Sequence, residues 1–280
     1  MDTLRVRLSG RRDARRSGAA MLGCSLAGAV LLVCAPPLRA QQPAAASKPP
    51  PSARAQEPFD PTGYWVSLIT QNWQYRMVVP GRGEYADIPM NAQAKKTADA
   101  WRSAADIAAG KQCEAYGAAA LMRNPERLHV SWQDDQTLRV DIDEGMQTRL
   151  LHFKAAASGT PPAASLQGYS RAHWILDTTV NTFGASLPGA VGHPPYGSLR
   201  VDTNDLLPGL LRKNGVPYGA DTTMSEYWDL RTLSPTQQWL TVSTKVEDPE
   251  YLFEPYVYDS IFQKEPDGSK WDPSPCSLTS

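Results

Sequence analysis

Two successive segments within residues 127–143 alternate strictly between apolar and polar side chains, which constrains the fold more than any other feature of the sequence. In RLHVSWQ (127–133), Leu128, Val130 and Trp132 fall on every second position, and TLRVDID (137–143) and QTRLLHF (147–153) follow it. Alternate residues of a β-strand share one face of a sheet. The intervening DDQ and EG are turn-forming residues. Residues 127–153 are therefore predicted to be a three-stranded meander with one apolar face.

The same kind of short, β-branched and aromatic segment recurs along the chain. Further strands are predicted at 64–70, 73–79, 168–176, 197–203, 222–230, 237–246 and 256–264, mostly separated by Gly- and Pro-rich joints. One helix is predicted over 91–110, with Asn91 as N-cap, Gly110 at the C-terminus and Trp101 docking it on the sheet. About ten strands and one amphipathic helix indicate a mainly β fold, either an antiparallel lipocalin-like barrel or a sandwich.

The first forty residues have the layout of a secretory signal peptide. Arginines in residues 5–16 precede an apolar run at 18–35, and Ala40 offers a small residue for cleavage. We expect a periplasmic or secreted protein; the sequence leaves the Sec and twin-arginine routes open. Residues 41–58 are Pro- and Ala-rich and are predicted to be a linker, and residues 59–280 a single β-rich domain.

Charge argues against some classes of partner. The whole chain carries a net charge of −1, and the predicted signal peptide contains seven Arg and two Asp, so the remainder carries −6. A mildly acidic protein is a poor ligand for nucleic acid or for anionic membranes. We therefore expect neither nucleic-acid binding nor membrane insertion after signal cleavage. The oligomeric state is left open.

Two cysteines, Cys113 and Cys276, lie outside the predicted signal peptide. In an oxidising compartment two such residues most simply form a disulfide. The alternative is a thiol nucleophile or a metal ligand, but the sequence has no C-x-x-C motif. We predict a disulfide, no metal site and no cofactor.

Histidines in the meander suggest one candidate catalytic site. His129, Arg139, Asp141 and His152 occupy the polar faces of three successive strands, and opposed residues in an antiparallel pair lie about 5 Å apart. Such a cluster could act as a general acid–base set or bind an acidic ligand. It could equally be the solvated outer face of a sheet.

Aromatic residues suggest a second site. The chain has eight Trp and eleven Tyr but only five Phe, and Trp and Tyr combine apolar area with a hydrogen-bonding group. Trp73, Tyr75 and Met77 share the apolar face of the strand predicted at 73–79 and are interpreted as core. Candidate ligand-binding residues are Trp65, Arg76, His173 and Trp174.

The stretch LQGYSRAHW (166–174) resembles a widespread group of exported bacterial proteins of uncharacterised function. The shared pattern is W-x-G-x-S followed by a Trp, then an E-x-[FY] strand and an E/D-D-P step. The matching residues are Gly168, Ser170 and Trp174, then Glu226 and Tyr227, and finally Glu247, Asp248 and Pro249, while Leu166 replaces the first Trp. The resemblance implies a calycin-like or lipocalin-like β fold over residues 59–276 and no particular reaction.

Three hypotheses of function follow. The first is an exported protein that binds a small apolar or aromatic molecule in a barrel cavity. The second is a periplasmic hydrolase, lyase or isomerase that uses the His129 cluster. The third is a structural or interaction protein of the cell envelope.

Overall fold

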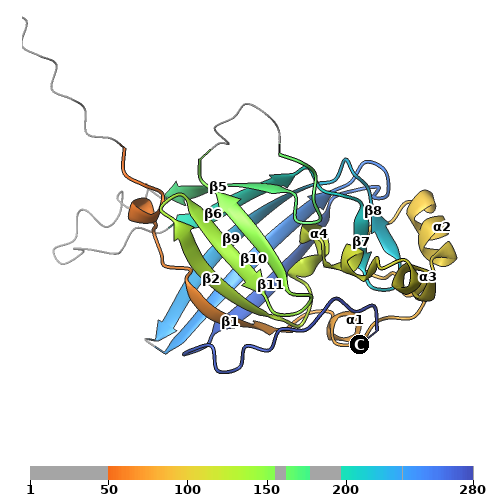
Figure 1. Cartoon of the computed structure of the whole chain (residues 1–280), viewed down its shortest axis with the longest axis horizontal. Helices are drawn as coiled ribbons and strands as arrows, with labels where there is room; N and C mark the ends of the chain where they lie inside the picture. Colours follow the sequence, from red (N-terminus) through yellow and green to blue (C-terminus); the bar gives the residue numbers. More distant parts are fainter. Residues whose placement is uncertain (1–49, 155–161, 177–196, 235, 280) are drawn as a thin grey trace, which may run out of the picture. The chain divides into compact units, whose positions relative to one another are not determined.

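The computed structural model describes residues 50–154, 162–176, 197–234 and 236–279. The predicted signal peptide, residues 1–40, lies outside them. The described chain is mainly β, and nine strands close into a barrel (Figure 1). In order around the barrel they are β1 (Gly63–Leu68), β11 (Tyr256–Lys264), β10 (Gln237–Glu247), β9 (Thr223–Ser234), β6 (Gly197–Asn204), β5 (Tyr169–Leu176), β4 (Gln147–His152), β3 (Thr137–Ile142) and β2 (Arg127–Asp134).

Closure of the sheet decides between the two predicted architectures in favour of the barrel. Eight of the nine neighbouring strand pairs are antiparallel, as expected. The pair β4–β5 is parallel and is joined through only two residue pairs, Leu151–Ser170 and His152–Arg171. The barrel is therefore mixed, and β4–β5 is its shortest seam.

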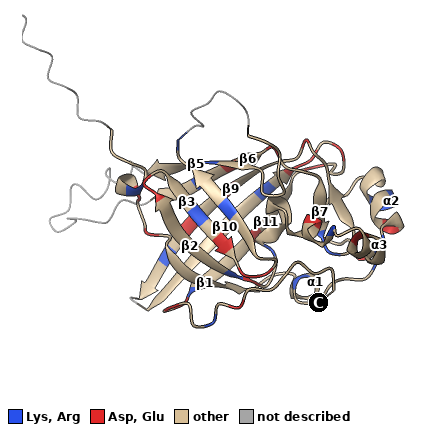
Figure 2. Cartoon of the chain, in the orientation of Figure 1, with Lys and Arg blue, Asp and Glu red and all other residues tan. Residues whose placement is uncertain are grey.

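The alternation in the sequence sets which residues point into the barrel. Leu128 and Val130 on β2 and Leu138 and Val140 on β3 are fully buried. The outer face instead carries ion pairs two residues apart on one strand, such as Arg139–Asp141, Arg200–Asp202 and Lys245–Glu247. Figure 2 shows basic and acidic positions interspersed along the barrel strands.

Large side chains fill the middle of the barrel and close one end of it. Trp65, Trp228 and Phe262 are completely buried in the central core. At the end where β2 meets β3, the core is completed by Phe59, Trp132, Phe153 and Trp174, which pack against one another and against the central cluster.

A smaller unit packs at the opposite end, at the right in Figure 1. It contains a two-stranded sheet, β7 (Gly209–Arg212) and β8 (Val216–Tyr218), with short helical segments around it. A buried hydrogen bond from the Tyr258 hydroxyl on β11 to the carbonyl oxygen of Ala119, 3.1 Å long, links this unit to the barrel. The helical segments are α1 (Trp73–Arg76), α2 (Ala92–Ala100), α3 (Ser103–Ala108), η2 (Gln112–Tyr116) and α4 (Ala118–Leu121).

The strand predicted at 73–79 is wrong, because this segment begins with the helical turn α1. Asn72 adopts a left-handed conformation with φ of 52°, which reverses the chain after β1, and its side chain donates to Asp87 at 2.6 Å. As a result Trp73 and Met77 are exposed rather than in the core. The prediction failed because an alternation over only the four residues 73–76 is compatible with a single helical turn as well as with a strand.

The predicted helix at 91–110 is two helices. The Asn91 side chain caps α2 by accepting from the amide of Ala94 at 2.9 Å, as expected. Trp101 and Arg102 are extended, which ends α2 and starts α3 at a new angle. Trp101 packs directly over Gly215, between β7 and β8, so that the ring docks the helices on this small sheet.

Two further segments are fastened to the barrel. Part of the predicted linker forms η1 (Arg54–Gln56), and the amide of Arg54 donates to the carbonyl of Asp135 at 3.2 Å. The predicted disulfide between Cys113 and Cys276 is present in the structure. It ties the C-terminal segment to η2.

Candidate functional site

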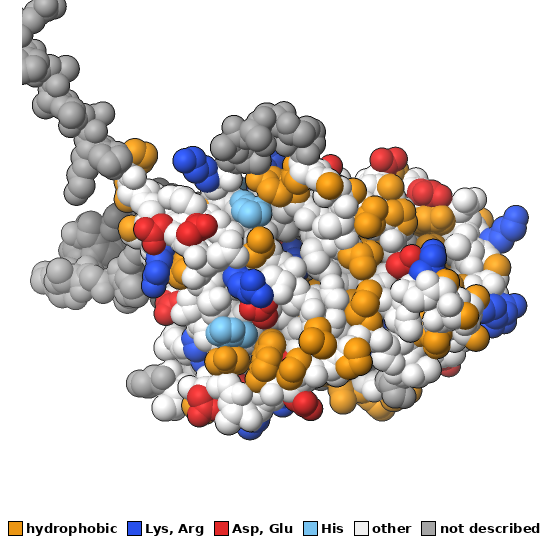
Figure 3. Space-filling model, viewed as in Figure 1, with side chains coloured by type: hydrophobic (Ala, Val, Ile, Leu, Met, Phe, Trp, Pro, Cys, Tyr) orange, Lys and Arg blue, Asp and Glu red, His pale blue; other side chains and the backbone are white. Residues whose placement is uncertain are grey.

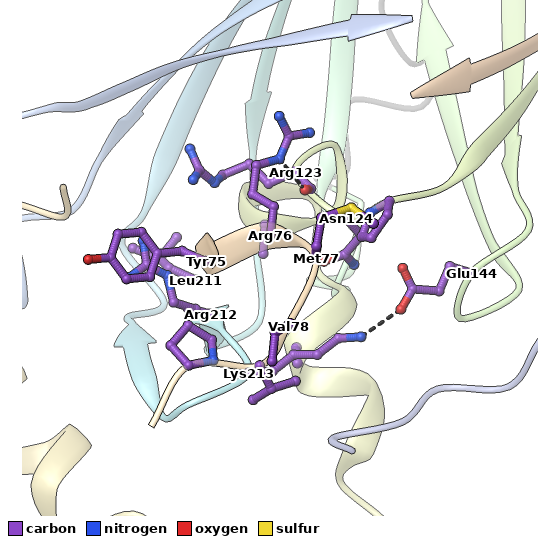
Figure 4. Close-up of a pocket in the computed structure, with 15 residues that line it drawn as sticks. Tyr75, Arg76, Met77, Val78, Arg123, Asn124, Glu144, Leu211, Arg212 and Lys213 are labelled. Carbon is purple, nitrogen blue, oxygen red and sulfur yellow. Dashed lines mark hydrogen bonds and ion pairs between the residues drawn. The ribbon is translucent and has the colours of Figure 1, made fainter. Parts of the chain in front are cut away.

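A cavity of about 70 Å³ lies between α1, α4, β7 and the segments that flank them (Figure 4). Its walls come from four stretches that are far apart in the sequence. The residues that line it are Tyr75, Arg76, Met77, Val78, Val79, Pro80, Ala115, Ala120, Arg123, Asn124, Pro125, Glu144, Leu211, Arg212 and Lys213.

Arg76 is one of two buried cations of this pocket, with 8% of its surface exposed, and Arg212 is the other, with 7%. The Nε of Arg76 donates to the carbonyl oxygen of Arg123 at 2.8 Å. Its Nη2 is buried and has no hydrogen-bond partner among the described residues. Burial, and after it the charge of Arg123, lowers the pKa of Arg76 to about 10. The fold thus holds a charged guanidinium at a position where its charge is incompletely compensated.

The other cations of the pocket are fixed by carboxylates and aromatic rings. Asp87 accepts from both Arg123 and Arg212. Lys213 donates to Glu144 at 2.6 Å. Four cations therefore line the pocket and only two carboxylates, Asp87 and Glu144, pair with them, so positive charge is in excess.

Aromatic rings hold two of these arginines in place. The Arg212 guanidinium lies 5.0 Å from the centre of the Tyr75 ring, and that of Arg123 lies 5.1 Å from the Tyr258 ring. Cation–π contacts of this kind position a guanidinium and leave some of its N–H groups free to donate hydrogen bonds to other groups. The arrangement suits recognition of a planar or tetrahedral anion.

A second polar group lies inside the barrel at the same end. Arg149 donates through Nη1 and Nη2 to the two oxygens of Glu226, at 2.9 and 2.6 Å, and both side chains are essentially fully buried. Glu226 lies in register with Thr244, which lies in register with Tyr258. The two opposite charges neutralise each other, although Arg149 Nε has no hydrogen-bond partner among the described residues. We therefore interpret the pair as a structural element beside the pocket.

The predicted cluster on the meander lies on the outer face of the barrel. His129 and Asp141 are opposed in the β2–β3 register, and Arg139 donates to both oxygens of Asp141 at 2.7 Å. Burial acts to raise the pKa of Asp141, but hydrogen bonds from Arg139 and Thr148 outweigh it and lower that pKa. A carboxylate held in this way is a weak proton acceptor at neutral pH.

His152 does not join that cluster. It is opposed to Thr137, near the other end of β3, and stacks on Tyr169 with ring centres 5.0 Å apart. Burial lowers its pKa. The ring of His129 stacks in the same way on Tyr64, at 4.3 Å. Both imidazoles thus pack against aromatic rings on the outer surface.

Of the four predicted ligand-binding residues, only Arg76 lines this pocket. Trp65 is part of the central core and donates from Nε1 to the carbonyl of Pro61 at 2.9 Å. Trp174 lies at the opposite end of the barrel, where it donates to the carbonyl of Ala53 at 2.8 Å. His173 is exposed on the outside of β5, opposite Arg200.

The remaining cations, Arg123, Arg212 and Lys213, are absent from the prediction. The one local signal for Arg212 is its position in GLLRKNGVPY, where a charged residue interrupts an apolar run that is buried in the structure. No local signal brings that run next to Arg76.

Comparison of the chain with protein-family models, with curated proteins and with solved structures finds no match. Among the described residues there is no group of three or more His, Cys, Asp or Glu side chains that could hold a metal ion. Over the same ranges, no helix is long and apolar enough to cross a membrane.

Proposed function

We propose that this is an exported small-molecule-binding protein whose ligand is an anion held in the pocket at the end of the barrel. The observation that carries the proposal is the excess positive charge of this pocket, which is lined by four cations, among them Arg76 with only 8% of its surface exposed. Export is supported by the signal-like N-terminal sequence and by the Cys113–Cys276 disulfide.

The site favours a ligand with a carboxylate or a similar oxyanion over a purely apolar one. The middle of the barrel is occupied by Trp65, Trp228 and Phe262, whereas the end pocket combines guanidinium donors with Tyr75 and Leu211. An oxyanion in the pocket would offset positive charge that is costly to bury without a counter-ion. Aromatic or aliphatic groups attached to it would meet the apolar part of the wall.

Calorimetric titration of the mature protein with a panel of small carboxylates, phosphate and sulfate tests this proposal. We expect Arg76→Met to weaken binding of the best anion roughly 10- to 100-fold, the range for a charged hydrogen bond. Arg231→Met removes an exposed arginine towards the opposite end of β9 and serves as the matched control. Equal binding by wild type and Arg76→Met, or no anion binding at all, would contradict the proposal.

Arg76→Met should also raise the melting temperature of the ligand-free protein, because it removes a buried and incompletely paired charge. Loss of binding together with higher stability would distinguish a ligand-binding arginine from one that merely maintains the fold.

A further inference from the structure

The wall of the pocket continues outward as exposed apolar surface. Met77 and Val78 line the cavity, yet they are 53% and 61% exposed. Trp73, one helical turn before Met77, is 65% exposed. Figure 3 shows hydrophobic side chains gathered on the surface in the region where Figure 1 places α1.

The volume of the cavity sets what can be enclosed. At about 15 Å³ per water-sized occupant, 70 Å³ holds roughly five such occupants, enough for an oxyanion and one or two attached carbons. A longer chain attached to that head must leave the pocket. The apolar side chains at its mouth are those of Met77 and Val78, so the chain would lie against them.

We propose that the ligand is a free, single-chain amphiphile whose anionic head occupies the pocket and whose apolar tail lies over Met77 and Val78. This inference rests on the proposed function. Charge complementarity selects the head, because Arg76 lies at the buried side of the cavity. The exposed methionine and valine select the tail, because covering them removes apolar surface from water.

A chain-length series is the direct test. Affinities for acetate, butanoate, hexanoate and octanoate, each below its micellar concentration, are measured by calorimetry at fixed salt. Each methylene that covers Met77 or Val78 should tighten binding up to about fourfold. Met77→Gln with Val78→Thr should flatten this dependence, so that the ratio of octanoate affinity to acetate affinity falls towards one, whereas Arg76→Met should weaken every member of the series.

Leu233→Gln is the matched control, since Leu233 is an exposed leucine towards the opposite end of β9. This variant should keep the wild-type dependence on chain length. Octyl trimethylammonium, which has the tail and the opposite charge, should not compete with octanoate.

The outcomes separate the two proposals. Equal affinity for acetate and octanoate would overturn the amphiphile and leave the anion site standing. Absence of binding across the whole series, with phosphate and sulfate also silent, would overturn the anion site itself. Sedimentation with phosphatidylglycerol vesicles in the absence of octanoate binding would show a membrane-docking surface and would likewise overturn a free amphiphile.

Discussion

Glu126 is a buried carboxyl group beside the pocket, immediately before β2. Its carboxyl oxygens have no hydrogen-bond partner within the described ranges. Burial, and then the negative charges of Glu144 and Asp143, raises the pKa of Glu126 well above the ordinary value. The protonated form is therefore the one that the fold accommodates.

This environment predicts a definite dependence of stability on pH. In the unfolded chain Glu126 ionises near its ordinary pKa of about 4.3, whereas in the folded protein it stays protonated to higher pH. The contribution of Glu126 to the free energy of unfolding is thus fully present below about pH 4.3 and is lost as the pH rises through the folded-state pKa. We expect Glu126→Gln to match wild type at pH 4 and to exceed it in free energy of unfolding at pH 7 to 8, as measured by urea denaturation.

Asp141 on the outer face provides a control, because its pKa is shifted in the opposite direction to that of Glu126. Its pKa is lowered in the fold, so its contribution is present above the unfolded pKa and is lost as pH falls through the folded one. Asp141→Asn should therefore alter stability above about pH 4 and converge with wild type in stronger acid. A Glu126→Gln variant that behaved in the same way would contradict the buried, protonated assignment.

Between elements, the Arg149–Glu226 pair links β4 and β9 across the inside of the barrel. Glu226→Gln should lower the free energy of unfolding by about 3–5 kcal/mol, because it leaves the Arg149 charge buried without a counter-ion. Replacing both residues with Leu should recover most of that loss. By contrast, Asp141→Asn at the outer pair should cost less than about 1 kcal/mol. Chemical denaturation of the four proteins checks this; equal losses at the inner and outer pairs would contradict the assigned burial.

The residues that match the resemblance pattern also make contacts that connect strands and turns. A Cβ at Gly168, where φ is +60°, would lie 2.4 Å from the carbonyl oxygen of Asn204. The Asp248 carboxylate accepts from the amides of Gly219 and Glu250, at 2.8 and 2.7 Å. With Glu226 in the interior ion pair, these matched residues hold strands and turns together. We therefore interpret these residues as structural.

Strands could be predicted from the sequence where burial of one face imposed an alternation of apolar and polar residues. The candidate site could not be predicted in this way. Strands β2 and β3 of the meander were correctly predicted because each alternates over several residues against one apolar interior, and β4 followed them after a recognisable turn. At α1 a single left-handed residue, Asn72, redirects the chain, and four residues cannot display a period. The pocket joins Arg76, Arg123 and Arg212 from three separate segments, and only the tertiary fold brings these together.

For the whole molecule, the Cys113–Cys276 bridge closes a loop across 163 positions of sequence, and it constrains the unfolded chain more than any local contact. The loop-entropy relation gives a stabilisation of about 5 kcal/mol for a loop of this length, at the upper end of what disulfides contribute. Further contacts position the C-terminal segment, since Ser274 pairs with Glu144 and the carbonyl of Ser277 accepts from the Tyr116 hydroxyl at 2.9 Å. These contacts break when the protein unfolds, so that without the disulfide the C-terminal segment would be free to move away from η2.

Replacement of both cysteines by serine should therefore lower the free energy of unfolding by about 3–5 kcal/mol. The denaturation midpoint of wild type should fall to that of the double variant in the presence of a reducing agent, while the variant itself should not respond to it. Because Glu144 pairs with both Ser274 and Lys213, the same change loosens one wall of the pocket, so anion binding should weaken along with stability. A variant that lost stability and kept full affinity would show that the pocket is held by the barrel alone.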